Sequence, residues 1–262
     1  MIKNFFVVGN NSSKSLSPTI FNYWFKKHKI KAKYGYIQLN NQNFDKGLKK
    51  LLLNKNVKGL NITIPFKKKI LKYIDVCDKH STNIKAVNCV TIKSKIFGTN
   101  TDWLGYYRTL PKNHKLKNKK VIIIGYGGAA LSIHYVLKNK GFKNIEIYNR
   151  TKKKLRYEKK TKFTKKLSQL PRNIQSAGLI INTTPSNPIQ KENIDLVDKK
   201  TILSDIVYTP KNTNFLKNFP ENKKIYGISM LVEQAKPCFK KWFGFEPIAD
   251  KGLFNILDKK IK

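Results

Sequence analysis

The sequence is short of acidic residues, cysteines and long apolar runs, and each shortage excludes a class of protein. Only 15 of 262 residues are Asp or Glu, against 54 Lys and Arg, which gives a formal net charge of +39. Cys77, Cys89 and Cys238 show neither CxxC spacing nor the even number of cysteines that staples a small secreted domain. No apolar run approaches the length of a membrane span, and Phe5–Val8 is too short for the core of a signal peptide. We therefore expect a soluble protein of the reducing cytoplasm, and we assign it no metal site.

The basic excess would ordinarily indicate a nucleic-acid or anionic-membrane partner. Most of the basic residues are lysines, however, and they are spread over the whole chain among abundant Asn, Ile, Phe and Tyr, as a genome-wide compositional bias would produce. Runs such as Lys67–Lys69, Lys152–Lys154 and Lys159–Lys160 could follow a phosphate backbone, but we interpret them as solvated helix faces. Neither a nucleic acid nor a membrane is the expected partner.

What the chain does have is enough apolar side chain for packed cores. Hydrophobic residues make up 40% of it, with 15 Phe, 12 Tyr and 3 Trp. Its length exceeds the size at which one core usually keeps growing, so two domains are favoured. Whether the protein is a monomer or a homodimer stays open.

The first part of the chain alternates between strand and helix patterns. A first helix is expected after Pro18, with an apolar face of Ile20, Phe21, Trp24 and Phe25. A second is expected at Phe44–Leu53. The strands that separate these helices are expected at Phe5–Val8, Lys33–Leu39 and Val57–Ile64. The pattern predicts a β-α-β-α-β unit.

Several polar residues stand at element ends in this unit. Ser17 before Pro18 fits an N-cap, although Ser15 and Ser17 beside a helix N-terminus could also cradle a carboxylate. Asn61 and Thr63 share one face of the third strand by its periodicity of two. Lys67 follows the carboxyl end of that strand, where open α/β sheets usually meet ligands.

Asp102 is conspicuous in a chain so poor in acids. It follows a hairpin-like segment, within Gly98–Gly105. It could simply start a helix with Thr101, running through Tyr106 to Leu110, and that role alone would account for it.

Val121–Ile124 is an unbroken β-branched run that leads into Gly125-Tyr126-Gly127-Gly128-Ala129-Ala130. Such a run is typical of a buried parallel strand, and the spacing Gly125-x-Gly127-x-x-Ala130 fits the turn that brings a backbone close to a pyrophosphate. By itself the loop could also be a strand-turn-helix corner that binds nothing.

The next strand ends in Asn149-Arg150-Thr151, with Lys154 beyond it. An acidic residue there would bind a free ribose 2′-hydroxyl, whereas these donors and positive charges suit a 2′-phosphate. Glu146 lies inside the strand and is poorly placed for the acidic role. The segment therefore favours NADP over NAD.

Two further apolar strands follow, and then a long helix. Gly178–Asn182 ends in Thr183-Thr184, and Thr201–Ser204 leads into Asp205-Ile206-Val207-Tyr208. Gly227 opens the last long helix, which contains Phe239 and Trp242, and in which Gln234 could be an ordinary surface residue.

Eight signatures in this order and spacing resemble the shikimate dehydrogenase family along nearly the whole chain. They are Ser15-Leu16-Ser17-Pro18, Asn61-Ile62-Thr63-Ile64-Pro65-Phe66-Lys67, Ala86-Val87-Asn88, Asn100-Thr101-Asp102-Trp103-Leu104-Gly105, the glycine loop, Asn149-Arg150-Thr151, Asp205-Ile206-Val207-Tyr208 and Met230-Leu231-Val232-Glu233-Gln234. The resemblance implies an α/β protein with an N-terminal substrate domain, an NADP-binding Rossmann domain and a C-terminal helix that returns to the first domain. The expected bounds are 1–101, 102–226 and 227–262.

The resemblance also implies an activity, the reversible NADPH-dependent reduction of 3-dehydroshikimate to shikimate in aromatic amino-acid biosynthesis. The substrate carboxylate would be bound by Ser15, Ser17 and Tyr208, and the ring hydroxyls by Asn61, Thr63, Lys67, Asn88, Asp102 and Gln234. Positions expected to contact the cofactor are Gly125, Tyr126, Gly127, Gly128, Ala129, Asn149, Arg150, Thr151, Lys154, Thr183, Thr184, Ile206 and Gly227.

Within that family chemistry, Lys67 and Asp102 are the expected catalytic pair. Hydride transfer to a keto carbon builds negative charge on oxygen, which a positioned ammonium group or acid must neutralise. Lys67 is the candidate, oriented by Asp102. Whether it transfers the proton or only stabilises charge stays open.

The sequence departs from the family pattern at three positions. Tyr126 stands where a small residue is usual and is expected to crowd or stack near the pyrophosphate. Cys89 replaces a Thr and is expected to pack rather than react, and Gly178 replaces an acidic residue. His28, His80, His114 and His134 fall outside every signature and receive no chemical role. The alternatives are a quinate/shikimate dehydrogenase with relaxed cofactor use and a non-catalytic basic protein on the same fold.

Overall fold

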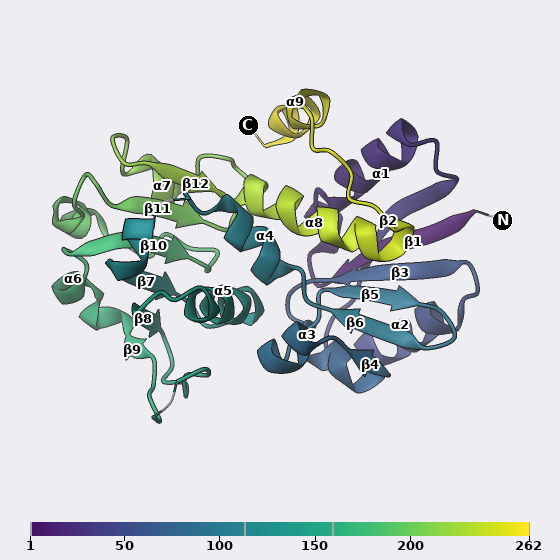
Figure 1. Ribbon diagram of the computed structural model, residues 1–262, viewed down its shortest axis with the longest axis horizontal. Helices are drawn as coiled ribbons and strands as arrows, with labels where there is room; N and C mark the ends of the chain where they lie inside the picture. The colour runs from purple at the N-terminus through teal and green to yellow at the C-terminus, as the bar shows by residue number, and fades with distance from the viewer. Residues whose placement is uncertain (1, 113, 159, 262) are drawn as a thin grey trace. The chain divides into compact units, whose positions relative to one another are not determined.

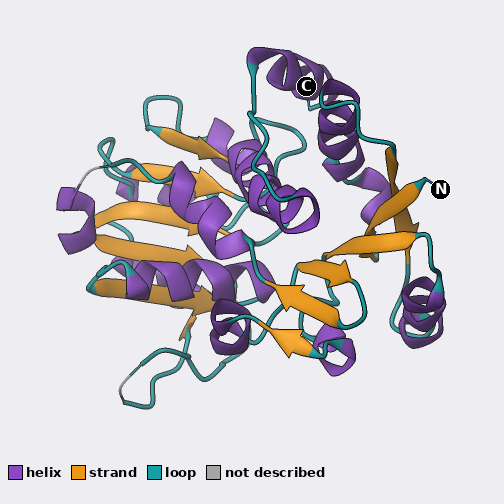
Figure 2. Ribbon diagram, turned by 45° about the vertical axis from the view of Figure 1, so that its right-hand side comes forward, coloured by secondary structure: helices purple, strands orange, loops and turns teal. Residues whose placement is uncertain are grey.

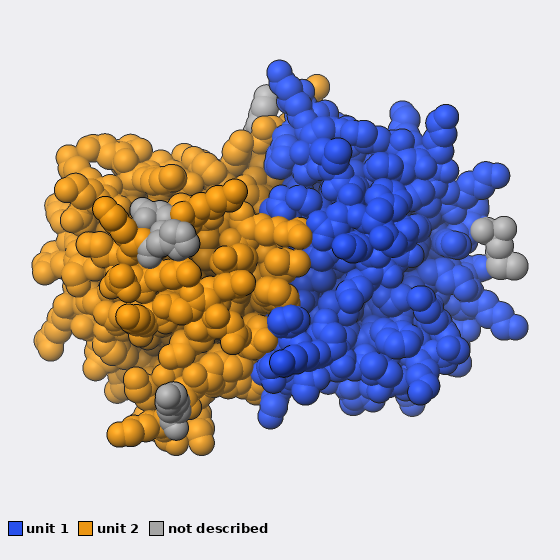
Figure 3. All heavy atoms as spheres, viewed as in Figure 1, with its two compact units in different colours: residues 1–102, 232–257 blue, residues 103–231, 258–262 orange. Residues whose placement is uncertain are grey.

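The computed structural model describes residues 2–112, 114–158 and 160–261. The chain divides into two compact units, which Figure 3 shows in different colours. Unit 1 consists of residues 1–102 and 232–257, and unit 2 of residues 103–231 and 258–262. The helix that begins at Gly227 therefore contributes most of its length to unit 1, although it follows unit 2 in the chain. The functional division at residues 101 and 226 stays a prediction.

Unit 1 is built on a mixed sheet with the order β2-β1-β3-β5-β6-β4 (Figure 1). β1, β2 and β3 are parallel, and β5 and β6 form an antiparallel hairpin beside β3. The predicted β-α-β-α-β unit is confirmed. Its elements and those that follow are β1 (Lys3–Gly9), α1 (Ser17–Lys27), β2 (Ala32–Gln38), α2 (Phe44–Leu53), β3 (Val57–Ile62), β4 (Val76–Cys77), α3 (Lys79–Ile84), β5 (Cys89–Ile92) and β6 (Ile96–Thr99).

The two faces of this sheet have different cores. On one face α2 packs through Phe44 and Leu48 against strand residues such as Leu60. The other face is aromatic: Phe5 of β1 lies 4.7 Å from Trp242 of α8 (Gly227–Phe243), measured between ring centroids. The predicted apolar face of α1 joins this cluster, since Ile20, Phe21, Trp24 and Phe25 are all buried. α8 thus completes the core of unit 1.

Unit 2 is built on a wholly parallel sheet with the order β12-β11-β10-β7-β8-β9, whose main strands lie side by side in Figure 2. This is the doubly wound arrangement expected of a Rossmann domain. The remaining elements are α4 (Asp102–Thr109), β7 (Lys120–Ile124), α5 (Gly128–Asn139), β8 (Asn144–Asn149), β9 (Lys165–Lys166), α6 (Leu170–Asn173), β10 (Ala177–Asn182), β11 (Ile202–Asp205), α7 (Asn214–Lys217), β12 (Lys224–Tyr226) and α9 (Lys251–Lys260).

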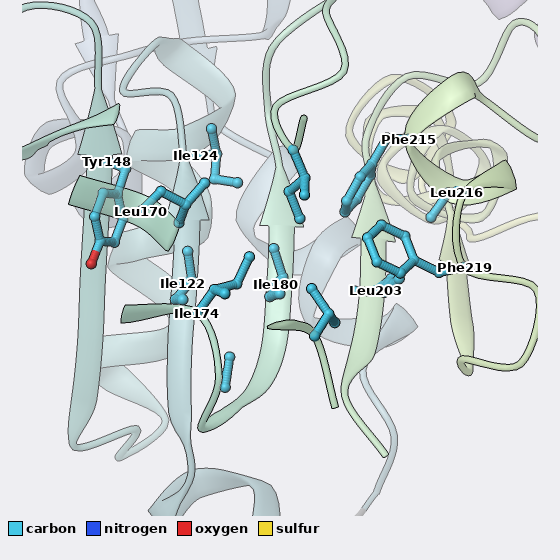
Figure 4. Close-up of a cluster of buried hydrophobic side chains, with 13 residues drawn as sticks. Ile122, Ile124, Tyr148, Leu170, Ile174, Ile180, Leu203, Phe215, Leu216 and Phe219 are labelled. Atoms are coloured by element: carbon cyan, nitrogen blue, oxygen red, sulfur yellow. The ribbon is translucent and has the colours of Figure 1, made fainter. Parts of the chain in front are cut away.

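The central strands of this sheet are buried on both faces. Ile122 and Ile180 pack with Leu170 of α6 and Phe215 of α7, as the close-up in Figure 4 shows. Side chains alternate along a strand, so Val121 and Ile123 of β7 point to the other face, and they too are fully buried. An uninterrupted Val/Ile run is the pattern that such two-sided burial requires.

Three sequence interpretations need correction. Ser17 is the first residue of α1 rather than its cap, because the N-cap is Leu16 and the helix has no side-chain cap bond. β3 ends at Ile62, two residues before the predicted end. Lys152–Lys154 are exposed as expected, but they lie in an irregular segment with a bridge from Lys154 to Phe163, not on a helix. Lys159 lies outside the described residues.

None of the helices in the described part of the chain combines the length and the apolar character that a membrane crossing would need.

Candidate active site

The predicted catalytic pair is in direct contact in unit 1. Lys67 Nζ lies 2.6 Å from Asp102 Oδ2, and the two side chains are only 13% and 5% exposed. Lys67 follows β3 and Asp102 is the first residue of α4, so the turn after a strand and the start of a helix bring them together. A nearly buried, hydrogen-bonded ion pair holds its ammonium group in one place. Asp102 therefore does more than begin a helix.

Asn88 connects this pair to the rest of unit 1. Its side-chain nitrogen is 2.8 Å from Asp102 Oδ1, 3.0 Å from Thr101 Oγ1 and 3.1 Å from Gln234 Oε1. Its side-chain oxygen accepts the backbone N–H of Thr101 at 2.7 Å. Asn88 is 2% exposed, and a buried amide with all its groups satisfied is fixed in orientation. It holds the Asp102 carboxylate toward Lys67.

Gln234 and Asn61 belong to the same network. Gln234, on α8, is buried, so the alternative that it is a surface residue is wrong. Asn61 donates to the backbone oxygen of Asn88 at 3.0 Å and to Cys238 Sγ at 3.1 Å, and its oxygen accepts the Tyr34 hydroxyl at 2.7 Å. Both N–H groups of Asn61 have protein partners, so a ligand would meet the second lone pair of its oxygen.

Ser15 and Ser17 form a separate polar pair. Their hydroxyl oxygens are 3.2 Å apart, and Ser15 Oγ also accepts the backbone N–H of Ser17 at 3.2 Å. Both lie at the start of α1, where the helix dipole favours an anion. Thr63, just past β3, donates its backbone N–H to Val8 at 2.9 Å. The structure thus joins Lys67, Asp102, Asn88, Asn61 and Gln234 in one network, while the serines form their own pair.

Unit 2 contains the expected dinucleotide turn between β7 and α5. Gly125 has φ +97°, a conformation that side chains rarely adopt, and a Cβ there would lie 2.5 Å from Thr183 Oγ1. Apart from its two chain neighbours, no described residue has an atom within 4 Å of a Cβ placed on Gly127, so space for a ligand is left beside that backbone. Gly128 and Ala129 form the first turn of α5, whose free N–H groups suit a phosphate. The loop therefore fits a pyrophosphate.

A cavity of about 790 Å³ opens beside this turn. Seven of the predicted cofactor positions line it, namely Gly125, Tyr126, Gly127, Asn149, Arg150, Thr183 and Thr184. Sequence reasoning missed a second group of lining residues, namely Leu167, Ser168, Leu170, Pro171, Ile174 and residues 185–190 and 193. No motif marks this group, because it comes from the α6 region and from the segment after β10.

The segment after β8 carries the predicted 2′-phosphate donors. Arg150, Thr151 and Lys154 are all exposed, so their charges and hydroxyl are accessible to a ligand. Asn149 donates to the backbone oxygen of Thr151 at 2.9 Å, which shapes the turn behind Arg150. Arg150 lines the cavity, whereas Thr151 and Lys154 are not among its lining residues.

Ile206, Tyr208 and Gly227 follow β11 and β12. A Cβ on Gly227 would lie 2.5 Å from the backbone oxygens of Ile206 and Val207, so only glycine fits there. Asp205 fixes this turn, since it accepts the Thr213 hydroxyl at 2.7 Å and the Val207 N–H at 3.0 Å. Burial raises the pKa of Asp205, and these hydrogen bonds oppose that rise. Tyr208 is half-buried in unit 2.

Tyr126 of the glycine turn contacts His134 of α5, since its hydroxyl lies 3.4 Å from His134 Nδ1. Tyr126 is 5% exposed, and its hydroxyl accepts the backbone N–H of Arg156 at 2.9 Å. His134 is fully buried, with Nε2 3.5 Å from Glu158 Oε1, and Lys138 Nζ lies 3.2 Å from the same oxygen. Burial lowers the pKa of His134 from 6.5 to about 4, although the Glu158 carboxylate acts in the opposite direction.

This histidine should make stability depend on pH. Between pH 6.5 and about 4 the unfolded chain binds a proton at His134 that the folded chain does not, so stability falls as the pH falls. We expect a loss of about 2–4 kcal/mol over that range. Urea unfolding at a series of pH values should show that the free energy of unfolding depends less steeply on pH in His134→Gln than in the parent. Equal slopes in His134→Gln and the parent would contradict this account.

Among the described residues, no group of three or more His, Cys, Asp and Glu side chains could hold a metal ion.

Two family models cover most of the chain. Residues 7–90 match the shikimate dehydrogenase substrate binding domain, and residues 109–229 match shikimate/quinate 5-dehydrogenase. The shikimate dehydrogenase (NADP(+)) of Pelagibacter ubique is 34% identical over 98% of this chain and 100% of that protein. That of Clostridium botulinum strain Hall is 36% identical over 90% of this chain and 95% of its own. The shikimate dehydrogenase structure from Aquifex aeolicus has a TM-score of 0.83 at 26% identity and covers 100% of this chain and 98% of its own.

Proposed function

Because the chain belongs to the shikimate dehydrogenase family, we propose that it catalyses the reversible NADPH-dependent reduction of 3-dehydroshikimate to shikimate. The observation that carries the proposal is the Lys67–Asp102 pair held by Asn88 and Gln234 in unit 1. A matching cofactor cavity lies beside the glycine turn of unit 2. Unit 1 would thus supply the substrate-binding and catalytic residues of the reaction, and unit 2 the cofactor-binding residues.

We propose that unit 1 binds the substrate through two polar groups. Ser15 and Ser17, paired at the start of α1, would donate their hydroxyls to the carboxylate. The ring hydroxyls would be met by the connected polar side chains and by Thr63. A site built to hydrogen-bond hydroxyls rejects analogues that lack them, because its buried polar groups are then left unpaired.

NADPH supplies a hydride when it is bound, and the protein must manage the charge that develops on the substrate oxygen. Lys67 would place its ammonium group at that oxygen, either donating a proton or stabilising the charge. Asp102 would keep the ammonium group oriented, and Asn88 would keep the carboxylate oriented in turn. Because the pair is nearly buried, water competes little for these interactions.

We propose NADP rather than NAD as the cofactor on the chemistry of the segment after β8. Arg150, Thr151 and Lys154 are exposed donors of the kind that binds a 2′-phosphate. Glu146, the acid of that strand, has its carboxylate taken by the Tyr148 hydroxyl at 2.7 Å and by Lys165 at 2.9 Å. It is therefore not available for a ribose hydroxyl.

A spectrophotometric assay at the NADPH absorbance band tests the function. Shikimate and quinate would be compared as substrates with NADP, and NADPH and NADH would be compared in the reverse direction. We expect activity with shikimate and a clear preference for NADPH. No turnover of shikimate would refute the proposed activity, and equal efficiency with NADPH and NADH would refute the cofactor assignment.

Replacing Ser15 by alanine should chiefly raise KM for shikimate, by about 5- to 30-fold. A hydroxyl that binds a carboxylate contributes about 1–2 kcal/mol, and it contributes equally to the ground state and the transition state. Steady-state kinetics should show kcat within about twofold of the parent. Ser13 is a matched control, since its hydroxyl donates to Gln38 on the exposed surface. A fall in kcat with unchanged KM would exclude a ground-state role for Ser15.

A further inference from the structure

Tyr126 is the one bulky residue in the glycine turn, and it lines the cavity beside that turn although most of its surface is buried. It is 5% exposed, and its hydroxyl lies 2.9 Å from the backbone nitrogen of Arg156, which donates to it. The two residues are 30 positions apart in sequence. The Tyr126 hydroxyl thus makes a long-range hydrogen bond within unit 2, and the expected crowding or stacking near the pyrophosphate stays a prediction.

The segment that Tyr126 reaches is the one with the proposed 2′-phosphate donors. Arg156 comes two residues after Lys154 and six after Arg150. Two residues earlier in the segment are held by Thr164, whose Oγ1 accepts the Lys153 N–H at 3.0 Å and donates to the backbone oxygen of Thr151 at 3.3 Å. The bond to Tyr126 therefore fixes the carboxyl end of this segment, whose middle is fixed by Thr164.

Further contacts bind the continuation of the segment to α5. Lys138 and His134, both on α5, lie 3.2 and 3.5 Å from Glu158 Oε1. The Tyr157 ring packs on the rings of His134 and Tyr135, with centroids 5.3 and 5.4 Å away. Tyr157 has φ +65°, a left-handed conformation that a bulky residue keeps only where its surroundings impose it. The hydrogen bond between Arg156 and Tyr126 is thus one of several contacts that hold this segment against the rest of unit 2.

We propose that Tyr126 is a positioning residue for the 2′-phosphate of the cofactor: its hydroxyl ties the segment with Arg150 and Lys154 to the glycine turn. The two parts of the cofactor site, one for the pyrophosphate and one for the 2′-phosphate, are thereby held in fixed register. This inference rests on the proposed NADP-dependent function and deepens it.

The expected size of the effect follows from the population of the ordered segment. A ligand that needs Arg150 and Lys154 in place binds with an affinity reduced by the fraction of molecules in which the segment is displaced. One buried hydrogen bond changes such an equilibrium by about 2- to 12-fold. A ligand without a 2′-phosphate does not need the segment and should be unaffected.

The test compares the binding of 2′,5′-ADP and ADP to the full chain by titration calorimetry. In Tyr126→Phe, which keeps the ring and removes the hydroxyl, we expect 2′,5′-ADP to bind about three- to tenfold more weakly, with ADP affinity within twofold of the parent. Hydrogen exchange supplies a second readout, because the Arg156 amide should exchange faster in this variant.

Tyr157→Phe is the matched control. It removes a hydroxyl from the same cluster, but the Tyr157 oxygen is buried without a hydrogen-bond partner among the described residues. It should therefore leave both affinities unchanged. Equal loss of both ligands in Tyr126→Phe, or no loss of either, would overturn the positioning role. Equal binding of 2′,5′-ADP and ADP to the parent would overturn both the inference and the NADP assignment, whereas a parent that prefers 2′,5′-ADP but does not turn over shikimate would refute only the proposed activity.

Discussion

Replacing Lys67 by alanine should lower kcat for shikimate by about 10²- to 10³-fold with a much smaller change in KM. Removal of one preorganised donor to a developing oxyanion typically has an effect of this size. In this protein the ammonium group is preorganised by a 2.6 Å contact with Asp102, and the pair is nearly buried. Steady-state kinetics would measure the loss, on a variant whose circular dichroism spectrum matches that of the parent and so shows that it is folded.

Two companion variants make the result specific. Lys68 is the neighbouring exposed lysine, so Lys68→Ala should leave kcat within about twofold of the parent. Lys67→Arg keeps the positive charge but removes a group able to donate a proton at neutral pH. Substantial activity in Lys67→Arg would indicate that Lys67 acts by stabilising charge rather than by transferring a proton. Near-normal turnover in Lys67→Ala would exclude Lys67 from the chemistry.

Replacing Phe239 by alanine should destabilise the fold by about 3–5 kcal/mol. Phe239 lies on α8 and is fully buried in unit 1. Its ring centroid is 5.7 Å from that of Trp24, 6.0 Å from that of Phe25 and 4.6 Å from that of Phe243. Truncation would leave a cavity among rings that cannot all move to fill it. Urea unfolding followed by tryptophan fluorescence would measure the loss.

Phe97 is the control for this truncation. It lies on β6 of the same unit and is 36% exposed, so Phe97→Ala should cost no more than about 1 kcal/mol. An equally small effect in Phe239→Ala would contradict the role of Phe239 in the core of unit 1.

Features whose cause is local could be predicted from the sequence. α2 has the predicted bounds, Phe44–Leu53, because its apolar residues recur at the helical period. The run Val121–Ile124 and the turn at Gly125 were also predictable, since burial on both faces and a positive φ restrict the residue types strongly. The contact between Lys67 and Asp102 was expected from the family resemblance, and the structure shows the pair at hydrogen-bond distance.

Features that depend on distant partners could not be predicted. The role of Tyr126 depends on a backbone N–H 30 residues away, which no local pattern indicates. Gln234 has an unremarkable place on a helix, and only the packing of α8 buries it against Asn88. Ser17 has the sequence of a cap, but Ser15 Oγ accepts the Ser17 N–H and the helix begins one residue early. Propensity gives way to tertiary context at each of these positions.

The division of the chain into units affects how it can fold during synthesis on the ribosome. The aromatic face formed by Phe5, Phe21, Trp24 and Phe25 is covered by α8 residues from Val232 onward, and roughly 200 residues separate the two in the sequence. At about 5–20 residues per second, this face waits some 10–40 seconds for its cover. During that time the nascent unit 1 exposes an apolar aromatic surface of the kind that chaperones bind. Unit 2 differs, because all but its last five residues have been synthesised before the α8 residues from Val232 onward.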